Sequence, residues 1–187
     1  MAMPAFASRS FACFALAFLL SLAAGCRSYQ LGHPAELPFE TIFVAPADNE
    51  SFAPQAQALV SSQLREAIIR DGRVRLVADR EQADTVLRVT LTDYERQPAT
   101  RNPNDTAVAL DYDLRLTAAI SLYSRTDGRY LLRDRQLSES STAFVNDVYA
   151  PAAAVDTQSL VQPEYQAMPR LTRDLARRIS GEVLGAW

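Results

Sequence analysis

Few side chains of this sequence occur in a pattern that could support catalysis. The single histidine, His33, precedes Pro34 in a polar stretch, a poor place to hold a general base beside a serine nucleophile. Asp111 and Asp113 are two residues apart and could share acid–base work, although a charged, solvent-facing strand explains them more simply. The sequence contains no glycine-rich phosphate loop, no His-Glu-x-x-His motif and no Gly-x-Ser-x-Gly motif. We therefore expect no catalytic residue, no metal site, no cofactor and no enzymatic activity.

Cys26 has the setting that points most clearly to a chemical modification. A nearly uninterrupted apolar run over residues 11–22 precedes it, Arg9 is the only charge before that run, and small residues lead up to the cysteine. A positive start, an apolar core and small residues at the end are the layout of a secretory signal. The apolar run is too short to span a bilayer comfortably, which takes about 20 apolar residues. The end of the run resembles a bacterial lipobox, with Ala23 at the place where leucine is commonest. We expect a signal peptide over residues 1–25 and lipidation of Cys26, with an ordinary signal and a chance cysteine as the alternative.

Lipidation at Cys26 would tie the chain to a membrane outside the cytoplasm. Each buried acyl CH₂ contributes about 0.8 kcal/mol, so two or three chains make a stable anchor. Arg27 follows the cysteine where an aspartate would suggest retention at the inner membrane, which favours the periplasmic face of the outer membrane. Residues 26–40 are polar and interrupted by prolines, so we expect a lipidated tether there and a single domain over residues 41–187.

The composition of the mature chain limits its functions further. All 19 basic residues are arginine, and removal of Arg9 with the signal leaves 18 basic against 22 acidic side chains. A chain with this acidic balance lacks the strongly basic face that nucleic-acid binding requires. Since Cys13 lies in the signal, the mature chain retains only Cys26, and the fold must be stabilised by its core without disulfides.

Hydrophobic periodicity predicts strands and two helices in the expected domain. The predicted elements are short strands at Thr41–Ala45 and Val74–Val77, a helix from Pro54 to Asp71, a strand from Leu87 to Arg96, a long strand from Val108 to Tyr123, its hairpin partner from Tyr130 to Phe144, and a helix from Glu164. Residues 97–105 contain two prolines and two asparagines and predict a loop, and Asp127-Gly128 predicts a hairpin turn. The charged middle of the last strand leaves its register open.

The order of these elements favours an α+β two-layer sandwich. We expect a mostly antiparallel sheet of four to five strands, with the two helices packed on one face. The long strand alternates most clearly, so one of its faces should be buried and the other polar.

Several short motifs, taken in order, resemble the lipopolysaccharide-assembly lipoprotein family called LptE. Tyr29-Gln30-Leu31-Gly32 is similar to the opening of that family, and the strand at residues 41–44 follows. Next come Asn49, Ser51 and Pro54 before the first helix, and Ala83-Asp84 before the following strand. The resemblance implies a plug inside a large outer-membrane β-barrel partner, LptD, which together with it passes lipopolysaccharide to the outer leaflet.

The resemblance also implies where partner and ligand would bind. A plug in a barrel needs a polar surface, because barrel interiors are polar. The outward face of the long strand and a hydroxyl-rich run in its partner offer one: Asp111, Asp113, Arg115, Thr117 and Ser121, with Ser138, Ser140, Ser141 and Thr142. Arg115, Arg133 and Arg135 are the candidate ligands for lipid A phosphates, since arginine suits bidentate phosphate contacts. Cross-strand pairing or solvent exposure is the simpler explanation for each of them.

Two other functions remain open on the sequence alone. The first is an outer-membrane lipoprotein that activates a cell-wall synthase across the periplasm. About fourteen residues separate Cys26 from the first strand, and their reach of about 50 Å favours a partner at the same membrane instead. The second, a periplasmic enzyme acting on glycan, rests only on carboxylates that the sequence does not bring together.

Overall fold

The computed structural model describes residues 37–102, 105–145, 160–185 and 187. The predicted signal peptide, the lipidation site at Cys26 and most of the predicted tether therefore lie outside the described residues. At the start of the described part, Phe39 is buried in the core and its ring contacts Trp187 edge-on at 6.3 Å between centroids.

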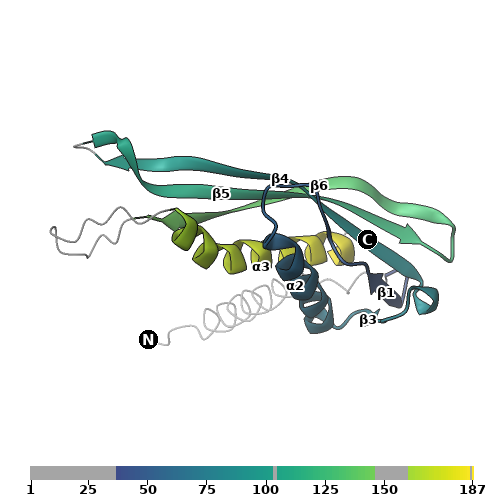
Figure 1. Ribbon diagram of the computed structural model, residues 1–187. Helices are drawn as coiled ribbons and strands as arrows, with labels where there is room; N and C mark the ends of the chain where they lie inside the picture. Colours follow the sequence, from purple (N-terminus) through teal and green to yellow (C-terminus); the bar gives the residue numbers. More distant parts are fainter. Residues whose placement is uncertain (1–36, 103–104, 146–159, 186) are drawn as a thin grey trace, which may run out of the picture. The chain divides into compact units, whose positions relative to one another are not determined.

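The described residues form one mixed sheet with two helices on one face (Figure 1). The elements are β1 (Thr41–Val44), β2 (Asp48–Asn49), α2 (Ala56–Asp71), β3 (Arg75–Leu76), η1 (Arg80–Gln82), β4 (Thr85–Asn102), β5 (Asp105–Ser124), β6 (Arg129–Phe144) and α3 (Val161–Gly185). The strands lie in the order β3-β1-β4-β5-β6, and β2 pairs with β4 beside this path. The three long strands are antiparallel, whereas β1, β2 and β3 pair in parallel. The predicted α+β two-layer fold is confirmed.

The core lies between the sheet and the helices, as the two periodicities predict. On β5 every second side chain is fully buried: Leu114, Leu116, Ala118, Ile120 and Leu122. On α2 the buried residues are four apart, and the helix ends at Gly72, whose φ of 76° places it in the left-handed region that favours glycine. On α3 most of the predicted face is buried, but Tyr165 is exposed and Glu164 faces the core. Pro169 lies inside α3, and the buried positions continue at spacings of three and four residues on both sides of it, from Glu164 through Met168 to Thr172.

The predicted loop over residues 97–105 is wrong. β4 continues through Pro98 to Asn102, and β5 begins at Asp105. Beyond Leu91 only β5 pairs with β4 among the described strands, so Pro98 lies on an edge, where its missing N–H is tolerated. The ladder is irregular on both sides of Thr100, which accommodates the proline.

The structure settles the register of β5 with β6, which the sequence left open. Ile120 lies opposite Arg135, and Leu122 lies opposite Leu132, so β6 carries one more residue than β5 between these two pairs. The extra residue is accommodated near Asp134, whose φ of 48° is unusual outside glycine. This β-bulge matters for the site, because it changes which side chains of β6 share a face. Among the described residues, no helix combines the length and the apolarity that crossing a membrane requires.

Candidate functional site

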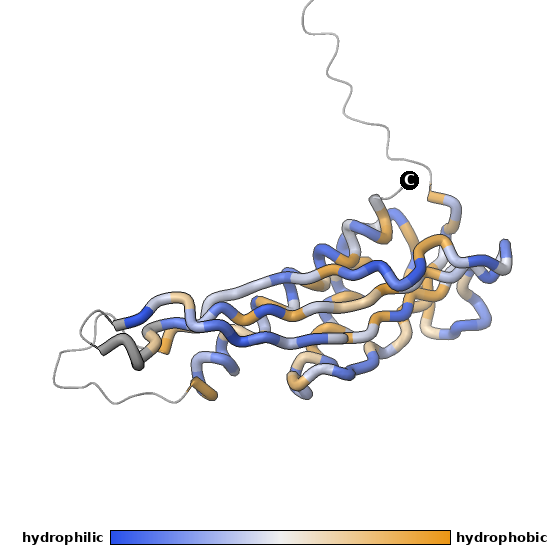
Figure 2. The backbone as a smooth tube through the Cα atoms, turned by 90° about the horizontal axis from the view of Figure 1, so that it is seen from above, coloured by the Kyte–Doolittle hydropathy of each residue, from blue (hydrophilic) through white to orange (hydrophobic). Residues whose placement is uncertain are grey.

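The face of the sheet opposite α2 and α3 is not covered by either helix (Figure 1). We call the face formed there by β4, β5 and β6 the open face. Figure 2, which views the molecule from above, shows these three strands lying side by side with alternating hydrophilic and hydrophobic positions. The alternation has a simple cause, since successive side chains of a strand point to opposite faces. Along β5, the apolar side chains thus point to the helix-covered face, and the polar side chains that alternate with them point to the open face.

The predicted polar face of the long strand forms the middle row of the open face. Cross-strand neighbours place Arg115 between Glu95 and Ser140, and Asp113 between Gln97 and Thr142. The Thr142 hydroxyl donates to Asp113 Oδ1 at 3.1 Å. In the hydroxyl run, Ser138, Ser140 and Thr142 lie opposite residues of this row, whereas Ser141 is buried on the face that the helices cover.

A groove of about 620 Å³ lies on the open face near the β5–β6 turn. Its lining carries three guanidinium groups, two phenol rings and one carboxylate: Arg80, Arg88, Arg133, Tyr123, Tyr130 and Asp134. The lining therefore has an excess of positive charge. Such a groove is suited to an anion, since guanidinium groups bind phosphate and carboxylate oxygens in pairs.

Aromatic and arginine contacts organise one wall of this groove. The rings of Tyr123 and Tyr130 meet edge-on, with 5.1 Å between their centroids. The Arg133 guanidinium lies over the Tyr130 ring, 4.5 Å from its centroid. At the bulge, the Ser121 hydroxyl donates to Asp134 Oδ1 at 3.1 Å and accepts from the Asp134 N–H at 3.0 Å. These contacts restrain the bulge and the Arg133 side chain. Arg80 and Arg88, by contrast, have no side-chain partner among the described residues.

The three predicted arginines are not brought together. Arg133 lines the groove, and Arg115 lines a neighbouring hollow of about 280 Å³ on the same face beside Asp93 and Glu95. Arg135 lies on the other face, where its Nε is 3.1 Å from Glu182 Oε1 of α3. Simple alternation would place residues two apart on one face, but the bulge at Asp134 separates Arg133 from Arg135.

Four of the five arginine and tyrosine residues that line the groove were not singled out from the sequence. Arg88 lies between the buried Leu87 and Val89, so the alternation of the strand could have predicted that its side chain lies on the open face. Tyr123 and Tyr130 flank the predicted turn, and only their cross-strand pairing makes them neighbours. Arg80 lies in η1, outside any periodic pattern, and no local signal marked it.

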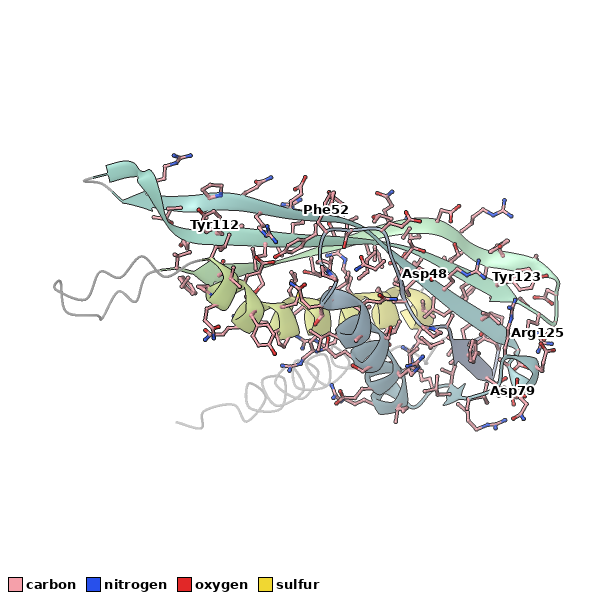
Figure 3. The ribbon with its side chains drawn as sticks, viewed as in Figure 1. Asp48, Phe52, Asp79, Tyr112, Tyr123 and Arg125 are labelled. Atoms are coloured by element: carbon pink, nitrogen blue, oxygen red, sulfur yellow. The ribbon has the colours of Figure 1, made fainter. Side chains whose placement is uncertain are left out.

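The loop that carries Arg80 is held by Arg125, the first residue after β5. Its Nη1 donates to the carbonyl oxygens of Arg80, Glu81 and Ala83 at 2.9, 2.7 and 3.0 Å. Its Nη2 also donates to Glu81 Oε2 at 2.8 Å. Figure 3 shows Arg125 at the end of the molecule that carries Asp79 and Tyr123. One guanidinium therefore positions the η1 wall of the groove against β5.

Asp84 joins the same loop to β1. Its Oδ2 accepts from the N–H groups of Glu40 and Thr41 at 3.1 and 2.9 Å, and its own N–H donates to the Thr41 hydroxyl at 2.8 Å. Burial alone would raise the pKa of Asp84, but the hydrogen bonds from Thr41 and Glu40, together with the nearby Arg75, outweigh it and lower the pKa below its usual value. Asp84 is thus a structural carboxylate of the motif Ala83-Asp84.

The described residues contain no group of three or more His, Cys, Asp or Glu side chains placed to hold a metal ion. The chemistry that the open face offers is recognition, through guanidinium groups, hydroxyl groups and aromatic rings arranged on a rigid sheet.

Comparison with known proteins identifies the family. The described residues form a two-layer α+β domain with one helix-covered face and one open face. The model of the LptE family, described as lipopolysaccharide-assembly, matches residues 39–180, and the chain belongs to this family. No curated protein sequence matches the chain.

Solved structures share this fold. A minor lipoprotein from Acinetobacter baumannii is similar with a TM-score of 0.50 and 18% identity, over 80% of this chain and 94% of that one. A protein from Xanthomonas campestris is similar with a TM-score of 0.51 and 11% identity, over 81% of this chain and 88% of that one. At these identities the likeness shows the fold alone.

Proposed function

We propose that the chain is an outer-membrane lipoprotein that plugs a β-barrel lipopolysaccharide translocon of the LptD type and assists its assembly. In this role it helps to deliver lipopolysaccharide to the outer leaflet, and it acts by binding, not by catalysis. Membership of the lipopolysaccharide-assembly family supports the proposal. The observation that carries it is the open face, a row of polar side chains along three long strands with a basic groove near one end. A surface of this kind suits the polar interior of a barrel.

The anchor proposed at Cys26 fits this role. With residues 1–25 removed, the lipid chains on Cys26 would hold the chain at the periplasmic face of the outer membrane, and residues 26–40 would act as a short tether. A tether of about fourteen residues reaches about 50 Å at most, so the domain over residues 41–187 would stay near the membrane that contains the barrel.

The groove is the proposed contact with lipopolysaccharide. Arg133 would bind a lipid A phosphate, with Arg88 and Arg80 completing a cationic site and the Tyr123 and Tyr130 rings offering faces to sugar rings. Arg115 would extend the site along the open face. Arg135 could contribute only by exchanging its ion pair with Glu182 for a ligand phosphate.

Co-purification tests the proposed partner. The full chain, tagged at its C-terminus, would be extracted from membranes in mild detergent, and the bound proteins identified and quantified. We expect an outer-membrane barrel in near-equal amount with the wild-type chain, and a lower yield with Cys26→Ala, which lacks the anchor. Recovery of a cell-wall synthase, or of no partner, would contradict the proposal.

A further inference from the structure

The loop between β2 and α2 presents one aromatic side chain to solvent. Phe52 is 88% exposed, the largest exposed fraction among the large hydrophobic residues of the described chain (labelled in Figure 3). A phenylalanine in such a position exposes apolar area that its own fold does not use. Asn49 at the end of β2 and Ser51 and Pro54 in the loop are the residues whose order before the first helix the sequence had singled out, and the proposed function gives them no role.

Hydrogen bonds restrain the backbone on both sides of Phe52. Asn49 Oδ1 accepts from the Ser51 N–H at 3.0 Å and from the Ser51 hydroxyl at 2.7 Å, and Asn49 Nδ2 donates to the Ala53 carbonyl oxygen at 3.1 Å. The Glu50 N–H donates to the Leu91 carbonyl oxygen at 2.9 Å, which ties the loop to β4. Ala53 is completely buried. These contacts fix the backbone that presents Phe52 to solvent.

An exposed aromatic ring on a restrained loop is suited to binding a partner. Little loop entropy is lost when such a residue becomes ordered at an interface, and aromatic residues often carry much of the binding free energy. The residues beside the ring set the charge of the surface, since Asp48 and Glu50 are both exposed carboxylates. These carboxylates would repel an anionic lipid surface and would attract a basic rim.

We propose that Phe52 is a docking anchor that inserts into an apolar pocket with a basic rim on the inner wall of the barrel partner. This inference rests on the proposed function, because it names the barrel as the occupant. The Asn49 and Ser51 side chains serve the interface indirectly, by holding the loop in its binding conformation.

Co-purification of Phe52→Ala with the barrel tests this anchor. The substitution removes an exposed side chain, so folding should be unaffected. We expect about a tenfold or greater loss of recovered barrel per molecule of tagged chain. The matched control is Ile69→Ala, which removes a 64% exposed side chain from α2 and should leave recovery within about twofold of wild type. Equal recovery with Phe52→Ala and wild type would overturn the anchor while leaving the proposed function intact.

Cross-linking provides a second, independent measurement. A photoreactive phenylalanine analogue placed at position 52 should cross-link to the barrel in intact cells, and the same analogue at position 69 should not. A cross-link from position 52 only to lipid, or only to another protein, would overturn the inference. If the wild-type chain recovers no barrel at all, the proposed function fails and the inference fails with it.

Discussion

At the scale of single residues, Glu164 is the clearest case of a charge enclosed by the fold. Its side chain is only 9% exposed, and Oε1 lies 2.9 Å from Arg96 Nη2 of β4. The Arg96 guanidinium also lies 5.2 Å from the ring centroid of Tyr94, and burial raises the pKa of that tyrosine to about 12. A buried carboxylate is tolerated only with a partner, so Arg96 stabilises the start of α3 against the sheet.

Arg96→Ala should lower the free energy of unfolding by about 1–3 kcal/mol, because it leaves the Glu164 carboxylate buried without its charged partner. Arg96→Ala combined with Glu164→Gln should recover part of this loss, since the neutral amide is cheaper to bury. Urea unfolding of the wild type, both single variants and the double variant would measure the coupling. Additive effects of the two substitutions would contradict this account.

Asp84 gives the protein a predictable dependence on pH. Its pKa is lowered in the folded state, so its contribution to stability is complete above the unfolded value of about 3.9 and is lost as the pH falls through the folded value. Asp84→Asn should be less stable than wild type by about 1 kcal/mol at pH 7, and this difference should shrink below about pH 4. Thermal unfolding between pH 7 and pH 3 measures it. A difference that stays constant down to pH 3 would exclude this role.

At the scale of elements, Arg125 joins η1 to the end of β5. Arg125→Lys keeps the charge but cannot reproduce the donation by one guanidinium to three carbonyl oxygens and a carboxylate. We expect a loss of about 1–2 kcal/mol and faster amide hydrogen exchange over residues 80–84. Arg129→Lys, in the same hairpin, is the control and should stay within about 0.5 kcal/mol of wild type. Unchanged exchange in Arg125→Lys would show that the loop is held by other contacts.

The elements also show how far the sequence could predict this fold. The buried face of β5 and the helix α2 could be predicted because each depends on one local periodicity. The continuation of β4 through Pro98 could not be predicted from the sequence. It depends on β4 having only β5 as a neighbour there among the described strands, and this follows from the pairing of the whole sheet. The faces of Arg133 and Arg135 also escaped prediction. A bulge is set by pairing between strands, and one extra residue reverses the alternation that sequence reasoning assumes.

At the scale of the whole molecule, the two faces of the sheet differ in composition and packing. The helix-covered face contains the apolar core and the ion pairs of Arg96, Arg135 and Arg178 with acidic residues, so it stabilises the fold. The open face carries the basic groove, where Arg80 and Arg88 have no side-chain partner among the described residues. The proposed recognition surface thus lies apart from the core, and Arg80 and Arg88 should tolerate substitution with little effect on folding.

The most direct test is the amount of lipopolysaccharide at the cell surface after controlled depletion of the chain in its native host. We expect surface lipopolysaccharide to fall on depletion and to be restored by the wild-type chain. The control variant Arg170→Glu/Arg173→Glu, on the exposed side of α3, should restore it as well. The groove variant Arg88→Glu/Arg133→Glu should not restore it at equal protein level. Surface lipopolysaccharide that stays unchanged on depletion, or that both charge-reversal variants restore equally, would contradict the account.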